Sequence, residues 1–233
     1  MSFFKVNPRD NLPVFLWVLI PVLSIIASIF IEYSINEEQR AWLVAENGPY
    51  EILQAVILIM ALVIAIYTLF KTSAKHKWLI AWVGFASLCC LYVAGEEISW
   101  GQHILKWDTP EYWQALNDQG ETNFHNTTSY LDQKPRLLLV IGVYIGGLIL
   151  PLMIFYKSKI LEKPFFKRFE VLYPTTQFFL LALICLFIKV TDKVSDFSSF
   201  NIFARNAEIE ELFIFYFVFL YLILMKKRLI AAP

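Results

Sequence analysis

Long, unbroken apolar runs alternate along this chain with short polar connections. Within the runs polarity does not alternate from residue to residue, which favours helices over strands. Each run approaches the roughly 20 residues that a helix needs to cross the hydrocarbon core of a bilayer. Because a lipid-exposed backbone must satisfy its own hydrogen bonds, we predict an all-α polytopic membrane protein with about six transmembrane helices. The predicted spans are about 12–31, 50–70, 78–95, 137–155, 171–190 and 207–225.

The composition agrees with this pattern. Apolar residues make up 58% of the chain, aromatic residues make up 17%, and the mean hydropathy is +0.56. The first run is too long for a signal peptide and no small-residue cleavage site follows it, so we expect an uncleaved span. All three cysteines fall inside predicted spans without a CxxC spacing, which indicates neither a disulfide framework nor a thiolate metal site. We expect residues 1–233 to form a single membrane-embedded helical domain.

The distribution of charge predicts the orientation of the spans. With the N-terminus in the cytoplasm, the inside segments hold 13 of the 20 Lys and Arg residues but only three of the 20 acids. A bias of Lys and Arg toward the cytoplasm is what orients membrane proteins, so we predict that both termini are cytoplasmic. A basic cytoplasmic rim is the ordinary result of membrane insertion, and no nucleic-acid partner is expected.

The predicted extracytoplasmic segment 96–136 is too long to be a simple turn. Within it, Asp108–Glu111 combines a capping residue, a proline and a first-turn acid, which together favour a helix start. We expect this helix to lie flat at the level of the lipid headgroups, where aromatic side chains are favoured. The nearby aromatic residues, which we interpret as interfacial anchors, are Trp100, Trp107, Tyr112, Trp113 and Phe124.

Two adjacent carboxylates, Glu96 and Glu97, stand directly after the third predicted span. A carboxylate at the membrane edge indicates a functional site by default, and the dipole at a helix C-terminus opposes its charge. If the helix continues, Glu96, Ser99 and His103 share one face and Glu97 points about 100° away.

A second group of acids precedes the sixth predicted span. Its purely apolar part, 212–225, has 14 residues and covers only about 21 Å. The helix must therefore extend back through three glutamates, of which Glu208 and Glu211 share a face. We expect His125, on the long outer segment, to fold over these acids. The acids that we expect to be ordinary solvated helix-end residues are Glu37, Glu38, Glu46 and Glu210.

Carboxylates gathered at one depth cannot all ionise without compensation. A bound cation, protonation, or a basic group such as Arg205 could neutralise them. A divalent metal such as zinc, iron or manganese offers the most chemistry, because an open coordination position activates water. The predicted metal ligands are Glu96, His103, His125, Glu208 and Glu211. The predicted catalytic residues are Glu97 as general base, with Ser99 and Gln102 orienting the water.

Two short segments, Gly95–Gln102 and Gln119–Asn126, resemble a group of uncharacterised bacterial multi-pass membrane proteins. The resemblance implies a location in the bacterial inner membrane and carries no activity. The glutamate pair is also similar to the start of the motif of glutamate-dependent intramembrane proteases. Their motif has an arginine after the pair, whereas Ile98–Gly101 follows here.

Three functions are compatible with these features. The leading hypothesis is a metal-dependent hydrolase that acts at the outer leaflet on a lipid or membrane-anchored substrate. The alternatives are a cation- or proton-coupled transporter or channel, and a non-catalytic accessory subunit of an envelope complex. The sequence leaves the substrate and the oligomeric state open.

Overall fold

The structure is a computed structural model. It describes residues 3, 6–43, 45, 48–73, 77–116, 122–124, 129–195, 197–198, 202–203 and 205–230. Side chains are described for all of these except His103 and residues 129–135.

Helices account for all the regular structure in these ranges, as the continuous apolar runs predict. The helices of five residues or more are η1 (Phe15–Leu19), α1 (Ile20–Ser34), α2 (Glu37–Leu43), α3 (Pro49–Lys71), α4 (Lys77–Glu97), α7 (Ser129–Tyr144), η4 (Ile145–Ile149), α8 (Leu150–Phe155), α9 (Pro164–Arg168), α10 (Phe179–Ser195) and α11 (Asn206–Ile230). The shorter ones are η3 (Ser99–Gly101), α5 (Gln102–Leu105), α6 (Glu111–Gln114), η5 (Glu170–Leu172) and η6 (Thr176–Phe178).

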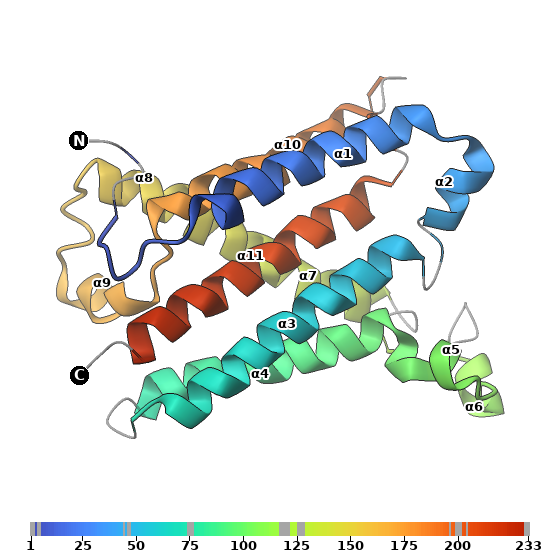
Figure 1. The fold of residues 1–233 in the computed structure, drawn as a ribbon, viewed down its shortest axis with the longest axis horizontal. Coiled ribbons are helices and arrows are strands. Elements are labelled where there is room, and N and C mark those ends of the chain that lie inside the picture. Colours follow the sequence, from blue (N-terminus) through green and yellow to red (C-terminus); the bar gives the residue numbers. More distant parts are fainter. Residues whose placement is uncertain are drawn as a thin grey trace.

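Five helical stretches of the described chain are long and apolar enough to cross a membrane. They coincide with the first five predicted spans and support a multi-pass membrane protein. Figure 1 shows the long helices running side by side along one axis of the molecule. The five stretches are Phe15–Ser34, Pro49–Lys71, Lys77–Glu97, Arg136–Phe155 and Glu170–Ser195.

The sixth predicted span forms helix α11, which is 25 residues long but is not one of these five. Glutamates at its start and Lys226–Arg228 at its end leave only 14 uncharged residues between them. The helix is nevertheless the centre of the bundle, where it packs against α3 and α10 (Figure 1). Most of its residues are buried, including the acid Glu210.

Small residues and polar contacts hold neighbouring helices against α11. A Cβ at Gly147, in η4, would come within 2.4 Å of the Ala182 Cβ and 2.9 Å of a Phe217 ring carbon, so this close approach requires glycine. The Tyr216 hydroxyl donates to the Leu16 carbonyl at 2.8 Å and thereby joins α11 to η1.

The predicted interfacial helix corresponds only to one short turn, α6, for which Pro110 is the N-cap rather than the first helical residue. Aromatic side chains in this part of the chain are exposed, with Tyr112 at 72%. The flat orientation in the headgroup region stays a prediction.

Candidate functional site

The chain reverses abruptly after helix α4, which ends at Glu97. Ser99, Trp100 and Gly101 all have positive φ angles, of 46°, 55° and 88°. The Trp100 ring consequently folds back over Gly95, where a Cβ would lie 2.8 Å from ring carbons. The expected helix continuation beyond Glu97 is therefore wrong, because a left-handed backbone cannot extend a right-handed helix.

This reversal encloses the carboxylate of Glu96, which is only 3% exposed. The Trp100 indole Nε1 donates to Glu96 Oε1 at 2.7 Å. The backbone N–H of Phe124 donates to Glu96 Oε2 at 2.6 Å. Each carboxylate oxygen thus accepts a short hydrogen bond of the kind that stabilises an ionised group.

Further contacts join the same two stretches of chain. Gln102 accepts hydrogen bonds at Oε1 from both the backbone N and the hydroxyl of Thr122, each at 2.7 Å. Its Nε2 donates to the Thr109 hydroxyl at 2.6 Å. The fully buried Asn123 donates through Nδ2 to Ser99 Oγ at 3.1 Å. We call this group the motif cluster: Glu96, Ser99, Trp100, Gln102, Thr109, Thr122, Asn123 and Phe124.

The motif cluster joins parts of the two distinctive sequence segments. Residues 95–102 end the helix, and residues 122–124 bond back to them across 20 or more positions. Three predicted site residues, Glu96, Ser99 and Gln102, each bond to a residue within 122–124. Their described polar contacts hold the segment in place, and their role in catalysis stays a prediction. Glu97 lies next to them and is half-buried.

The predicted metal centre is only partly visible in the described chain. His125 and the side chain of His103 lie outside the described residues. Among the residues that are described, no three His, Cys, Asp or Glu side chains are placed to hold a metal ion. Glu208 and Glu211, the other predicted ligands, make their described ion pairs with arginines instead. Metal binding remains a prediction.

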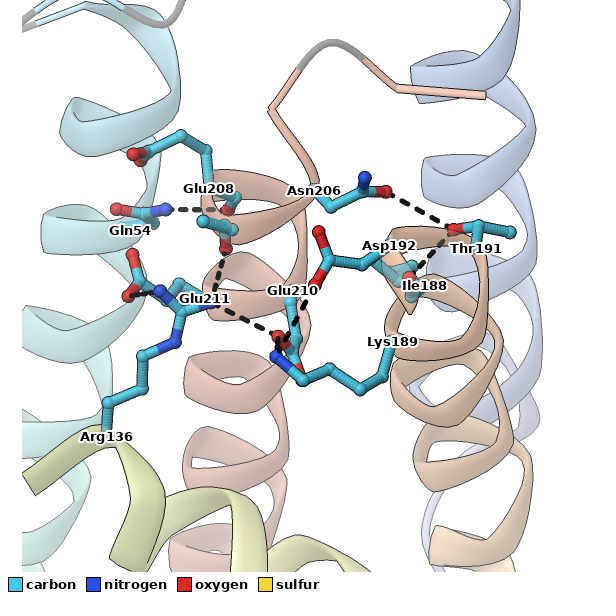
Figure 2. A network of polar contacts seen from close by, with 11 residues as sticks. Gln54, Arg136, Ile188, Lys189, Thr191, Asp192, Asn206, Glu208, Glu210 and Glu211 are labelled. Atoms are coloured by element: carbon cyan, nitrogen blue, oxygen red, sulfur yellow. Dashed lines mark hydrogen bonds and ion pairs between the residues drawn. The ribbon is translucent and has the colours of Figure 1, made fainter. Parts of the chain in front are cut away.

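A second polar group surrounds Glu210, whose side chain is only 2% exposed (Figure 2). The expectation that Glu210 is a solvated helix-end acid is wrong, because this face of α11 turns toward α7 and α10. Its Oε2 lies 3.2 Å from Arg136 Nη2 and 3.3 Å from Lys189 Nζ. Its Oε1 is buried and has no hydrogen-bond partner among the described residues.

The neighbouring acids of α11 are also paired. Arg136 Nη1 lies 2.9 Å from Glu211 Oε1, and Arg205 Nη1 lies 3.7 Å from Glu208 Oε1. Figure 2 shows that the Glu208 carbonyl also accepts a hydrogen bond from Gln54 on α3, at 2.8 Å. The ion pair between Arg205 and Glu208 shows that a basic group approaches one of these acids, as one of the three sequence-based alternatives expected.

The carboxylates around Glu210 outnumber the cations by one among the ion pairs of the described residues. Lys189 also approaches Asp192, at 3.9 Å, so these pairs comprise four carboxylates and three cations. We call this group the charge network; its members are Arg136, Lys189, Asp192, Arg205, Glu208, Glu210 and Glu211.

Sequence reasoning missed Arg136 and Lys189. A signal for both was present, because Lys189 is a charge inside the fifth predicted span and Arg136 directly precedes the fourth. Charges inside membrane spans are rare and usually paired. Only seven of the 20 Lys and Arg residues fall outside the predicted cytoplasmic segments, and these two are among them.

Comparisons with known proteins add no identification, since no family model, curated protein or solved structure matches this chain.

Proposed function

We propose that this protein is a membrane-embedded transporter coupled to a proton or a monovalent cation, with Glu210 as the coupling carboxylate. The observation that carries the proposal is the buried Oε1 of Glu210, which has no hydrogen-bond partner among the described residues.

The position of the network at one end of the bundle is compatible with an ion-binding site. Lys189 lies within one candidate span and Arg136 begins another, and both meet Glu210 on the central helix. Ionisable residues inside membrane bundles pair with one another and mark ion pathways and proton relays. The buried amide of Gln54 adds a second polar atom without a described partner, Oε1, on the adjacent helix α3.

The charge balance selects the class of ion. An uncompensated charge in a low-dielectric interior costs several kcal/mol, and the charge network has a net formal charge of −1. One proton or one monovalent cation on Glu210 Oε1 would neutralise it and supply the missing partner. A divalent cation would leave the network positive, so it fits less well.

Charge displacement on a solid-supported membrane tests this proposal without knowledge of the substrate. Proteoliposomes receive rapid jumps in pH, Na⁺ or K⁺, and the transient current reports ion binding. We expect a current for at least one ion in the wild type and its loss in Glu210→Gln. The matched control is Glu32→Gln, which removes another ion-paired carboxylate, 2.7 Å from Arg40, and should keep the current. A current unchanged in Glu210→Gln, or absent for every ion in the wild type, would refute the proposal.

A metal-dependent hydrolase acting on a lipid or membrane-anchored substrate is the second candidate. It is favoured by the motif cluster, which gathers Glu96, Ser99 and Gln102 beside the half-buried Glu97. Metal analysis of purified wild type, Glu96→Gln and His125→Ala distinguishes the candidates. Bound zinc, iron or manganese in the wild type that is lost in both variants supports the hydrolase. Negligible metal in all three removes it.

Both candidates use the same topology, with the chain in the bacterial inner membrane and both termini in the cytoplasm. The bias of Lys and Arg toward the predicted inside supports this orientation. A C-terminal reporter that is active only in the cytoplasm should be active. An inactive reporter on correctly inserted protein would reverse the orientation.

A further inference from the structure

A cavity of about 500 Å³ is lined by residues of α8 and α9. Figure 1 shows that these two helices lie at the end of the bundle opposite to the start of α11, where the charge network lies. The size of the cavity falls within the roughly 300–1,000 Å³ range of small-molecule sites. Separate stretches of the chain line it: the N-terminal segment, α8, the connection to α9, α9 itself and residues 170–176. The predicted orientation places this end at the cytoplasmic leaflet.

The walls of the cavity are fixed by well-formed contacts. Arg228 at the end of α11 pairs with Asp10 at 2.8 Å and donates to the carbonyls of Val171 and Tyr173 at 2.6 and 2.8 Å. The Tyr173 hydroxyl donates to the Phe166 carbonyl at 2.7 Å. These bonds join the N-terminal segment, α9 and the 170–176 segment, so the protein's own contacts hold the walls of the cavity together.

Charged side chains of both signs line the cavity. Among the described lining residues three are basic and three are acidic, so their formal charges sum to zero. Arg228 and Asp10 neutralise each other. The four remaining charged side chains are exposed and form no ion pair within the described chain; they are Lys157, Glu162, Lys167 and Glu170.

Two buried hydroxyl groups complete the lining. Thr175 and Thr176 are 7% and 5% exposed, and their Oγ1 atoms have no hydrogen-bond partner among the described residues. A buried polar atom without a partner is destabilising, and a ligand in the cavity would supply that partner. Apolar side chains, among them Met153 and Leu161, form the rest of the wall.

We propose that this cavity binds a phosphoethanolamine group, with the phosphate on Lys157 and Lys167 and the primary ammonium on Glu162 and Glu170. A zwitterion matches the neutral cavity, whereas free phosphate or an anionic headgroup would bring excess negative charge. Lysine is a common phosphate ligand. A quaternary ammonium cannot donate hydrogen bonds and is usually held in a cage of several aromatic rings, but Tyr173 is the one aromatic residue among the described lining residues.

Native mass spectrometry of the delipidated full chain in detergent tests the proposal. The probes are short-chain phosphatidylethanolamine, phosphatidylcholine and phosphatidylglycerol, together with soluble glycerophosphoethanolamine. We expect the ethanolamine lipid to bind at least about tenfold more tightly than the other two lipids, the ratio that corresponds to one charge-assisted contact. Equal binding of soluble glycerophosphoethanolamine would identify a free metabolite as the source of the group, and much weaker binding would identify the lipid.

Two double lysine variants distinguish binding at the cavity from a general effect of positive charge in this region. Lys157→Gln/Lys167→Gln should weaken ethanolamine-lipid binding about tenfold or more. Lys159→Gln/Lys163→Gln removes two lysines of the same region that do not line the cavity, and it should leave binding unchanged.

A variant that gains affinity for one lipid cannot simply be misfolded, so the glutamate pair supplies this control. Glu162→Gln/Glu170→Gln makes the cavity positive and should raise affinity for phosphatidylglycerol while lowering it for the ethanolamine lipid. Equal binding of all three lipids by the wild type, equal losses in both lysine pairs, or no change of preference in the glutamate pair would overturn the proposal.

Discussion

Removing Arg136 should destabilise the protein more than removing the buried acid that it contacts. Arg136 pairs with Glu210 at 3.2 Å and Glu211 at 2.9 Å, and donates to the Ala207 carbonyl at 3.1 Å. Arg136→Gln withdraws all three contacts and leaves Glu210 with Lys189 as its remaining described cation. The excess negative charge of the network then rises by one.

The magnitudes follow from burial. Removing one partner of a buried ion pair costs about 3–5 kcal/mol. Because the Arg136 side chain is 23% exposed and Lys189 stays, we expect about 3 kcal/mol for Arg136→Gln, the low end of that range. Glu210→Gln leaves Arg136 with Glu211 and removes a charged oxygen that has no described partner, so we expect about 1 kcal/mol, the value of one net hydrogen bond.

The double variant measures how the two residues depend on each other. When residue 210 is already a neutral glutamine, the loss of Arg136 leaves only Glu211, and not Glu210, without its arginine partner. The combined cost should be about 2 kcal/mol, below the sum of the single costs, as is usual for residues that touch. Reversible unfolding in mixed micelles, followed by circular dichroism, supplies the three free energies. Arg168→Gln, at an exposed arginine, is the control. Additive costs, or a Glu210→Gln variant as unstable as Arg136→Gln, would refute the reasoning.

Two further predictions concern packing and the motif cluster. Gly147→Ala should lower the free energy of unfolding by about 1–3 kcal/mol through overpacking, because the new Cβ would lie 2.4 Å from the Ala182 Cβ. Gly142→Ala is the control, because a Cβ there meets open space, and its free energy of unfolding in the same assay should be close to that of the wild type. Trp100→Phe keeps a ring over Gly95 but removes the indole donor to Glu96. It should lower the free energy of unfolding by about 1–3 kcal/mol, the range for a buried acceptor that loses its partner. An unfolding midpoint equal to that of the wild type would contradict the role of this hydrogen bond.

The positions of the apolar helices were predictable because the signal is local. A continuous apolar run specifies a helix through its own composition, and the first five predicted spans match the structure within a few residues except at the start of the fifth. There, η5 (Glu170–Leu172) and η6 (Thr176–Phe178) form separate short turns and α10 begins at Phe179. Tyr173 and Pro174 lie between these turns, and proline removes a backbone donor that a regular helix would use.

The candidate site depended on contacts that no local pattern contains. The cost of burying Glu96 was visible in the sequence, but its two donors were not. One donor requires a left-handed backbone at Trp100, which is uncommon for a residue other than glycine. The other is the amide of Phe124, 28 positions away. Helical periodicity assigned Ser99 to a continuing helix that does not exist, whereas Ser99 and Glu96 instead bond to the neighbouring residues Asn123 and Phe124.

The charged ends of helix α11 explain why a criterion based on the length of an uncharged stretch does not identify it as a membrane span. A helix that meets lipid on most sides needs a long uncharged stretch, and α11 has only 14 such residues. Because other helices surround it, its ends meet protein instead. Arg136 and Lys189 compensate Glu210 at one end, and Asp10 compensates Arg228 at the other. The charges that exclude α11 from the five candidate spans are thus the groups that connect it to its neighbours, and Oε1 of Glu210 is the buried atom for which the described neighbours supply no hydrogen bond.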